Sequence, residues 1–290
     1  MELIALKIRP LSAFSTVPKG DTLFGHIVAY DFLTGGRIFE NYLNEKPKLI
    51  VSDMMPLGYV YRPKLPLECF VKNIDKKDRK KWRKKEYIKI DDFLDGNFSM
   101  CEEVEFWSER QVIKNSINRV TFTTDSENFA PYENRETVFS RELWVLMLVE
   151  KEIKKRVLEL IKMVGKFGFG KDTTTGKGYF EVKEIEARKI DLDSNYYMSI
   201  SPVILEGEKF IQCWYEPFTR FGKFGLDKAH GNAFKKPVLM ANSGAVVKSD
   251  KKIKFFGKAK NNGNDKPSFL QGYSIALPFK IKDEKCLNAR

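Results

Sequence analysis

The sequence of 290 residues is poor in histidine and has no paired cysteines, and both shortages limit its chemistry. It contains only His26 and His230, so few side chains have an ordinary pKa near neutral pH for acid–base catalysis. Its four cysteines lie far apart, without the C-x-x-C spacing of zinc or redox sites, and we predict four reduced thiols. No grouping of carboxylates, histidines and cysteines predicts a metal site, and we expect no cofactor.

Long apolar runs are also missing, since none approaches the ~20 residues that a membrane span requires. The first ten residues, MELIALKIRP, lack the basic region, long apolar core and cleavage site of a signal peptide and are typical of a strand followed by a turn. We therefore expect a cytoplasmic protein without a membrane partner.

Positive charge, in contrast, is abundant. The chain has 51 Lys and Arg against 39 Asp and Glu, which gives a formal net charge of +12. Such an excess is typical of proteins that bind nucleic acid, the commonest partner with many negative charges. A lysine-rich surface without any such partner is the alternative.

The most informative segment is KFGFGKDTTTGKGY at 166–179, which contains four glycines and three lysines. Glycines let the backbone approach a ligand closely and adopt positive φ, and successive N–H groups in such a loop suit an anion. We therefore expect the segment to bind the phosphates of a polynucleotide. The residues that we assign to this contact are Lys166, Gly168, Phe169, Gly170, Lys171, Thr173, Thr174, Gly176, Lys177 and Gly178.

Neither common nucleotide-binding motif fits this segment. Gly170 and Gly176 are separated by five residues rather than four, and Gly178 occupies the position of the magnesium-binding hydroxyl of a P-loop. The loop also joins a helix to a strand, which is the reverse of a P-loop. A Rossmann fingerprint fails because Thr173 stands where its third glycine should be.

The periodicity of apolar residues predicts an α+β fold. Residues 3–9 alternate as in a strand, and 21–33 predict a helix that Asp21 or Thr22 would cap. The continuous apolar run at 143–150 is typical of a strand buried on both faces, and 151–164 have the period of an amphipathic helix.

A further strand is expected at 178–186, after the glycine-rich loop. This order suits a ferredoxin-like domain, an antiparallel sheet backed by helices, over residues 1–188. Within it, residues of about 40–110 form a basic insertion, in which eight of the ten residues 76–85 are cationic. RNA contact and a solvated surface are equally good explanations of that basic run. Residues 189–290 are rich in strand patterns and predict a second, smaller β-rich domain.

Several other segments carry candidate RNA-binding residues. Lys19 and Gly20 precede the first helix, where free N–H groups bind phosphates. Residues 115–124, NSINRVTFTT, predict a strand that carries Asn115 and Arg119. The segment 218–236 interleaves phenylalanines with cations, as single-strand binders do, and supplies Arg220, Lys223, His230, Lys235 and Lys236. A turn with Ser243 and Gly244 could add N–H donors.

Five sequence blocks together resemble a known family. They are GDTLFG (20–25), NSINR (115–119), GFGKDTTTGKGYF (168–180), KKPVLMANSGAVV (235–247) and GYSIALPF (272–279). In this order they are similar to the RAMP superfamily, the RNA-binding subunits of CRISPR effector complexes, and more narrowly to the fourth subunits of type III-A Csm complexes. Residues 40–110 fit that pattern only loosely.

The resemblance implies a pair of ferredoxin-like domains and a non-catalytic subunit that binds the 5′ handle of the CRISPR RNA. It also implies that the chain caps the filament of backbone subunits and docks on the large polymerase-like subunit. Some RAMP proteins process CRISPR RNA without metal by using a histidine on the first helix. His26 therefore supports an alternative, a metal-independent endoribonuclease, although a half-buried helix residue is the simpler explanation.

Overall fold

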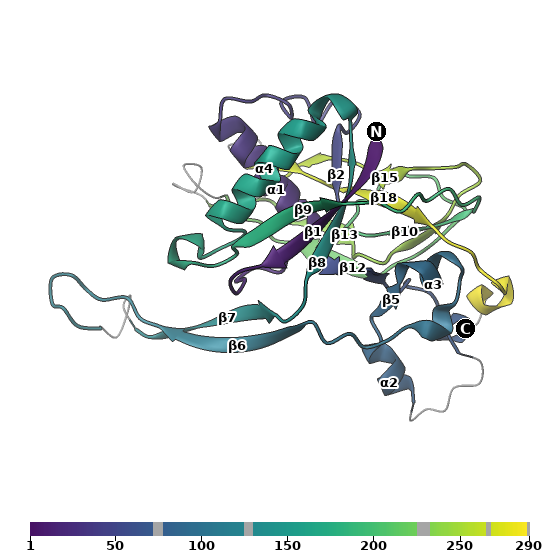
Figure 1. The fold of residues 1–290 in the computed structure, drawn as a ribbon, viewed down its shortest axis with the longest axis horizontal. Coiled ribbons are helices and arrows are strands. Elements are labelled where there is room, and N and C mark those ends of the chain that lie inside the picture. The colour runs from purple at the N-terminus through teal and green to yellow at the C-terminus, as the bar shows by residue number, and fades with distance from the viewer. Residues whose placement is uncertain (72–77, 125–129, 225–232, 265–267, 289–290) are drawn as a thin grey trace.

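The described residues form two five-stranded sheets, two long helices, a protruding hairpin and several shorter elements (Figure 1). The computed structural model describes residues 1–290 except 72–77, 125–129, 225–232, 265–267 and 289–290. Within those described ranges, no helix combines the length and apolar character that a bilayer crossing requires.

The first sheet is antiparallel throughout and has the strand order β2-β8-β1-β9, with β3 also paired to β8. Its strands are β1 (Glu2–Pro10), β2 (Leu49–Val51), β3 (Met55–Pro56), β8 (Leu143–Val149) and β9 (Phe180–Ile185). All seven residues of β8 are buried, which confirms the prediction from its continuous apolar run. In the register of the sheet, Leu6 lies opposite Val145 on one side and Glu184 on the other.

Helices α1 (Gly20–Leu33) and α4 (Lys154–Phe167) cover one face of this sheet, and the short 3-10 helix η3 (Lys151–Ile153) precedes α4. The apolar face of α4 packs with the side chains of β1 and β8 in one core, as its helical period predicts. The predicted cap at Asp21 or Thr22 is wrong, because α1 begins at Gly20 and has no side-chain capping bond. Asp21 is instead buried in an ion pair with Arg220.

The second sheet comes from the C-terminal part of the chain and has the strand order β11-β14-β10-β18-β15. Its strands are β10 (Tyr196–Ser199), β11 (Gln212–Trp214), β14 (Val246–Lys248), β15 (Phe255–Gly257) and β18 (Tyr273–Pro278). Two shorter pairs flank it: β12 (Pro217–Arg220) with β13 (Val238–Ala241), and β16 (Lys260–Asn261) with β17 (Phe269–Leu270). In the described part of 189–290, the helical element is the 3-10 turn η6 (Glu284–Asn288).

The two sheets share a hydrophobic core. Ala5 and Leu146 point away from the helices and belong to the same buried cluster as Met198, Val246 and Leu277 of the second sheet. The boundary expected at 188/189 falls between β9 and β10, so the chain passes from one sheet to the other there.

Within the insertion predicted over about 40–110, β2 and β3 pair with β8 in the first sheet. The remainder is a set of short elements beside the second sheet. It contains β4 (Tyr59–Tyr61), η1 (Leu67–Cys69), α2 (Arg79–Lys84), β5 (Tyr87–Lys89), α3 (Ile90–Leu94) and η2 (Phe98–Met100). The ring of Phe93 lies 5.0 Å from that of Phe279, which joins the insertion to the shared core.

A long hairpin of β6 (Trp107–Lys114) and β7 (Tyr132–Phe139) extends away from the body (Figure 1). The strand predicted over 115–124 is wrong, because β6 ends at Lys114 and these residues form the hairpin tip. The tip turns at Asn118, whose side chain accepts the N–H of Val120 and whose carbonyl accepts the N–H of Phe122. An asparagine side chain that bonds the backbone two residues on favours a turn over a strand.

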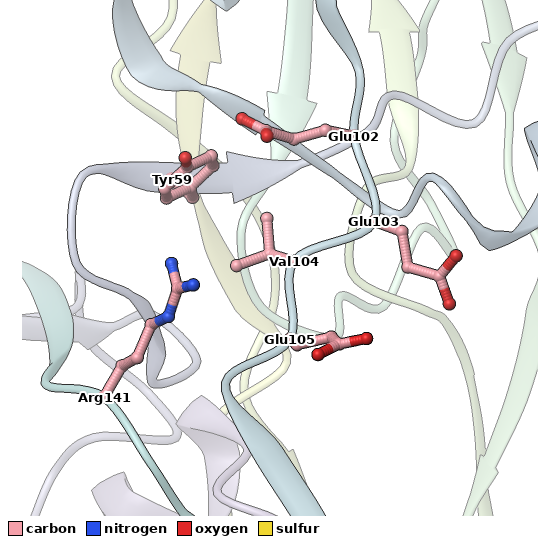
Figure 2. Close-up of a pocket in the computed structure, with 6 residues that line it drawn as sticks. All are labelled: Tyr59, Glu102, Glu103, Val104, Glu105 and Arg141. Carbon is pink, nitrogen blue, oxygen red and sulfur yellow. The ribbon is translucent and has the colours of Figure 1, made fainter.

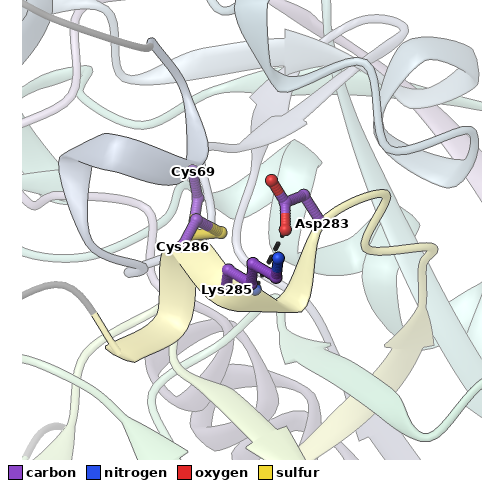
Figure 3. Close-up of a disulfide and its surroundings, with 4 residues drawn as sticks. All are labelled: Cys69, Asp283, Lys285 and Cys286. Atoms are coloured by element: carbon purple, nitrogen blue, oxygen red, sulfur yellow. Dashed lines mark hydrogen bonds between the residues drawn. A yellow bond between two sulfur atoms is a disulfide. The ribbon is translucent and has the colours of Figure 1, made fainter.

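A disulfide joins Cys69 in η1 to Cys286 in η6 (Figure 3). The prediction of four reduced thiols is therefore wrong, and Cys101 and Cys213 are the two free cysteines. Because 217 residues separate the bonded pair, no local spacing could have revealed it.

This pairing makes a countable prediction. When the purified chain is denatured without reductant, a maleimide should label two thiols, Cys101 and Cys213, and after reduction it should label four. Intact mass measurement counts the adducts. Four adducts before reduction would contradict the disulfide.

Candidate nucleic-acid interface

The glycine-rich segment is a closed loop between α4 and β9. Gly168 and Gly178 stand at its neck with φ of +97° and +77°, a range that favours glycine. The N–H of Phe169 donates to the carbonyl of Gly178 at 2.9 Å, and the N–H of Gly178 donates to that of Ala13. Phe169 is fully buried and packs against Phe14, so its ring shapes the loop from the inside.

Most N–H groups of the loop already have acceptors within the protein. The N–H of Gly170 donates to His26 Nε2 at 3.0 Å, and that of Lys171 donates to Thr16 Oγ1 at 3.0 Å. Among the described residues, no acceptor meets the N–H groups of 172–174, which begin the 3-10 turn η4 (Thr173–Thr175). Thr174 is exposed there. The part of the loop that can offer N–H donors to an anion is thus this turn.

His26 supports the loop from α1. Burial lowers the pKa of His26 to about 4, and the positive charge of Lys235 acts in the same direction. The ring is therefore neutral near pH 7 and can accept the hydrogen bond from Gly170. This bond gives His26 a structural role.

An ionic cluster ties the loop to the β6–β7 hairpin. Lys171 Nζ donates to Asn134 Oδ1 at 2.8 Å, and Lys177 Nζ lies 2.8 Å from Glu136 Oε2. Asp172 accepts hydrogen bonds from Lys114 and Asn134. Two of the predicted lysines therefore meet the hairpin that also carries Asn115 and Arg119, both exposed at its tip.

Charge in this cluster is dominated by cations. Burial alone would raise the pKa of Glu136, but hydrogen bonds and charges of Lys177 and Arg110 outweigh it and lower that pKa. Burial alone would raise the pKa of Asp172, but polar contacts with Ser15, Asn134 and Lys114 and the charge of Lys114 outweigh it and lower that pKa. Both carboxylates are thus anionic at neutral pH, and four cations still outnumber them. These cations are Arg110, Lys114, Lys171 and Lys177.

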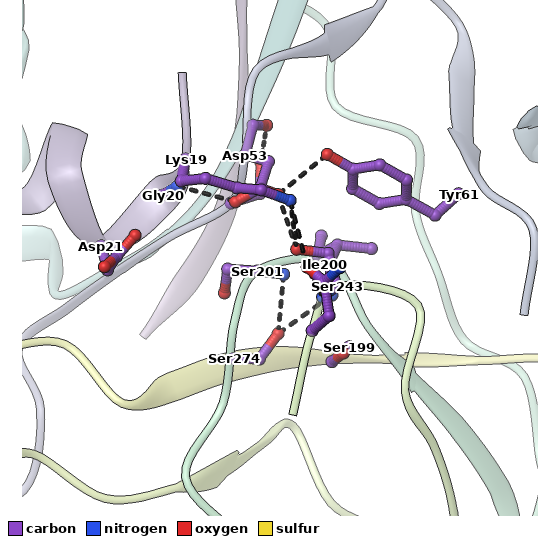
Figure 4. A network of polar contacts seen from close by, with 12 residues as sticks. Lys19, Gly20, Asp21, Asp53, Tyr61, Ser199, Ile200, Ser201, Ser243 and Ser274 are labelled. Atoms are coloured by element: carbon purple, nitrogen blue, oxygen red, sulfur yellow. Dashed lines mark hydrogen bonds and ion pairs between the residues drawn. The ribbon is translucent and has the colours of Figure 1, made fainter. Parts of the chain in front are cut away.

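Lys19, Gly20 and Ser243 meet in a buried network around Asp53 (Figure 4). The carboxylate of Asp53 lies 2.8 Å from Lys19 Nζ and accepts the N–H of Gly20 at 2.7 Å. It also accepts the hydroxyls of Ser243 at 2.6 Å and Tyr61 at 2.8 Å. A β-carbon on Gly20 would lie 2.4 Å from the carbonyl oxygen of Val51, so only glycine permits this approach.

Other predicted donors are also engaged within the protein. Arg220 forms its ion pair with Asp21, and burial raises the pKa of Asp21 although Arg220 opposes that shift. The N–H of Ser243 donates to Asn242 Oδ1, and that of Gly244 donates to the carbonyl of Ser199. Arg220 thus joins α1 to β12, and the N–H groups of Ser243 and Gly244 are used within the turn between β13 and β14 and its contact with β10.

The second predicted surface extends from β12 and β13 as a hairpin, in which Lys223 pairs with Phe234. Lys223 Nζ lies 4.7 Å from the ring centroid of Phe234, and Lys235 Nζ lies 5.0 Å from that of Phe224. Phe221 is 76% exposed, and Lys236 is also exposed. Because the charge of Lys235 acts on His26, this hairpin lies near the helix that supports the glycine loop. His230 lies outside the described residues.

Lys166 is exposed in the last turn of α4, with Nζ 5.8 Å from the ring centroid of Phe167. Gly176 is open, since nothing lies within 4 Å of where its β-carbon would be. Gly168 and Gly178 are buried at the neck, whereas Gly170 and Thr173 are half-buried.

A separate hollow of about 280 Å³ lies between β4 and the segment that precedes β6 (Figure 2). It is lined by Tyr59, Glu102, Glu103, Val104, Glu105 and Arg141. The carboxylate of Glu103 points away from Arg141 in this view. The lining carries more carboxylates than cations and would repel phosphate, so we place no RNA there. In the described part of the chain, no three His, Cys, Asp or Glu side chains are grouped to hold a metal ion.

Several residues that build the interface have no recognisable signal in the sequence. Asn134 and Glu136 lie in β7, for which we predicted no strand, and Asp53 lies in the segment 40–110, which has little regular pattern. Each acts through partners far away in the sequence, such as Lys177 at 41 residues from Glu136 and Ser243 at 190 from Asp53.

No protein-family model matches the sequence, and no curated protein matches it. Solved structures do. A chain of the Csm3–Csm4 subcomplex in the type III-A CRISPR-Cas interference complex is 17% identical with a TM-score of 0.64, over 96% of this chain and 99% of that chain. Chains of the Csm1–Csm4 cassette in complex with pppApA and with AMPPNP are 17% and 19% identical, each with a TM-score of 0.60 over 97% of this chain and 99% of that chain.

The chain therefore belongs to the α+β class, because its sheets are mostly antiparallel and the described residues contain few helices. More narrowly, the chain has the fold that the matched chains of the Csm1–Csm4 and Csm3–Csm4 complexes share. At 17–19% identity the likeness defines the fold.

Proposed function

We propose that the chain is a non-catalytic RNA-binding subunit of a type III-A Csm complex that holds the 5′ handle of the CRISPR RNA. The observation that carries this proposal is the turn at 172–174, where unbonded N–H groups stand beside a cluster with excess positive charge. Backbone N–H groups and lysines together suit the phosphates of a bent single strand.

We propose that only some of the RNA-binding residues predicted from the sequence contact RNA directly. Exposed or half-exposed members would contact RNA directly: Asn115, Arg119, Lys166, Lys171, Thr173, Thr174, Gly176, Lys223 and Lys236. Lys235 would also contact RNA at the β12–β13 hairpin. Buried or paired members would hold the loop and α1 in place: Lys19, Gly20, Gly168, Phe169, Gly170, Lys177, Gly178, Arg220, Ser243 and Gly244.

One feature supports the proposed partners, and another supports the proposed ferredoxin-like domain. The likeness covers nearly the whole chain in both Csm1–Csm4 and Csm3–Csm4 complexes, so we propose counterparts of Csm1 and Csm3 as partners. From the family resemblance, these roles are those of a large polymerase-like subunit and a filament backbone subunit. The order β1-α1-β2-β8-α4-β9 with strand order β2-β8-β1-β9 supports a ferredoxin-like domain over 1–188.

The proposal predicts a local effect on RNA binding. Replacing Lys166 and Lys171 by glutamine should weaken binding of handle-containing RNA and reduce the slope of log K against log salt by about 1.4, since two fewer counterions are released. Lys151→Gln with Lys155→Gln, at the other end of α4, is the matched control. Fluorescence anisotropy across a salt series measures both.

An unchanged salt slope in the Lys166/Lys171 variant would show that the glycine-rich loop does not contact the RNA phosphates.

The same RNA should be recovered intact after incubation with the protein in EDTA. Specific cleavage that disappears in His26→Ala would replace the scaffold proposal with the endoribonuclease alternative.

A further inference from the structure

The basic helix α2 has no part in the interface described above, although it is the densest concentration of charge in the sequence. Residues 79–85 read RKKWRKK, with six cations in seven positions. In the view of Figure 1, α2 lies below the body, whereas the loop after α4 lies on the left. The two sites would therefore bind different stretches of a ligand.

Trp82 fixes this helix to the body. Its ring lies 6.5 Å from that of Phe70, and its carbonyl accepts a hydrogen bond from Arg62 at 2.5 Å. Lys85 Nζ covers the indole at 4.1 Å from its centroid. The side chains of Trp82 and Lys85 are thereby used in holding α2 in place.

The other cations of α2 point to solvent. Arg79, Lys80, Lys81, Arg83 and Lys84 are all exposed. Lys81 pairs with Asp78 at 3.4 Å, but both side chains are more than half exposed, so this pair contributes little.

Such an arrangement is unfavourable in the free protein. Arg79 with Arg83, and Lys80 with Lys84, are like charges four residues apart on one helix, which destabilises it. A polyanion would relieve this repulsion and gain the entropy of released counterions. An RNA backbone has phosphates spaced closely enough for several of them to lie along one short helix. The net charge of +12 of the whole chain also favours RNA over an acidic protein as the partner.

We propose that α2 is a second, sequence-independent contact for the phosphate backbone of a single-stranded RNA, separate from the glycine-rich loop. Its arginines and lysines would lie along the strand, and Trp82 would act as an anchor rather than a stacking platform. The contact would add affinity without reading bases.

The test uses the full chain and a uridine homopolymer, which lacks any handle sequence. The variant Arg79→Gln/Lys80→Gln/Arg83→Gln/Lys84→Gln keeps Trp82 and Lys85, and glutamine is a good helix former. The matched control removes the same charge from scattered exposed lysines: Lys46→Gln/Lys155→Gln/Lys209→Gln/Lys251→Gln. Anisotropy across a salt series gives the dissociation constant and the salt slope.

We expect the α2 variant to raise the dissociation constant about ten-fold or more and to reduce the salt slope by about 2–3, with less than half of that change in the control. A double variant, Lys80→Gln/Lys84→Gln, should show about half of the slope change. Ultraviolet crosslinking of thiouridine-substituted RNA should label the α2 peptide. Unchanged unfolding temperatures would establish that the variants are folded.

Equal behaviour of the α2 variant and the scattered control would overturn the proposal. So would loss of a co-expressed protein subunit without a change in RNA affinity, since α2 would then face an acidic protein. The Lys166/Lys171 variant separates this inference from the proposed function. If only the Lys166/Lys171 variant loses RNA affinity, the inference about α2 fails and the proposed function stands. If only the α2 variant loses RNA affinity, the inference stands and the glycine-rich loop is not an RNA contact.

Discussion

Replacing Asp53 by alanine should lower the free energy of unfolding by about 3–5 kcal/mol, because it leaves a nearly buried ammonium without its counter-charge. The side chain of Lys19 is 16% exposed and that of Asp53 is fully buried. After the substitution, Lys19 Nζ would retain only Asn242 Oδ1 and Ser243 Oγ, at 3.3 and 3.2 Å. The N–H of Gly20 and the hydroxyl of Tyr61 would also lose their acceptor.

Denaturant unfolding of four variants measures this effect. Lys19→Met with Asp53→Ala should be less destabilised than the sum of the single changes, because the unpaired charge is gone. Tyr61→Phe removes one hydrogen bond and should cost about 1 kcal/mol, which makes it the control for loss of a single partner. A loss of under about 1 kcal/mol in Asp53→Ala would show that water reaches Lys19 and that the network is not buried in solution.

Alanine at Gly178 should destabilise the protein by about 3 kcal/mol or more and abolish the loop-dependent part of RNA binding. Two costs combine there. The φ of +77° is unfavourable for alanine, and the new β-carbon would lie 2.1 Å from the carbonyl oxygen of Phe169. The loop neck, where Phe169 and Gly178 bond to each other, would have to open.

Gly176→Ala is the matched control, because Gly176 has a similar φ of +84° but nothing within 4 Å of the added carbon. It should cost only about 1–2 kcal/mol of stability, because the added carbon meets no neighbour and the loop neck stays closed. Unfolding curves and anisotropy on both variants give the comparison. Equal losses of stability would mean that backbone conformation alone, and not the closed neck, requires glycine at 178.

Local patterns in the sequence predicted the elements that bury regular faces. The apolar run of β8 and the helical period of α4 gave the central strand and its covering helix, because burial repeats with the geometry of each element. The glycine-rich segment lies between α4 and β9, where its four glycines indicate an irregular backbone.

The failures are of another kind. Asp21 has the local signature of a cap, but its partner Arg220 lies 199 residues away and the buried ion pair outweighs capping. NSINR has the composition of a strand end and a cationic site, yet the turn at Asn118 decides its shape. Lys19 has the position of a phosphate ligand, but Asp53 and Ser243 engage it from other elements. Contacts at such separations leave no periodic signal.

The common core between the two sheets has a consequence for how this chain can be divided. If the chain were divided between Ile185 and Tyr196 and the two fragments were separated, each would expose an apolar sheet face to water. Ala5 and Leu146 would be exposed on one fragment, and Met198 and Leu277 on the other. Neither fragment would fold stably by itself, so a recombination event that keeps the protein functional must transfer both sheets together. Changes in length are tolerable instead in the β6–β7 hairpin, which extends away from the body.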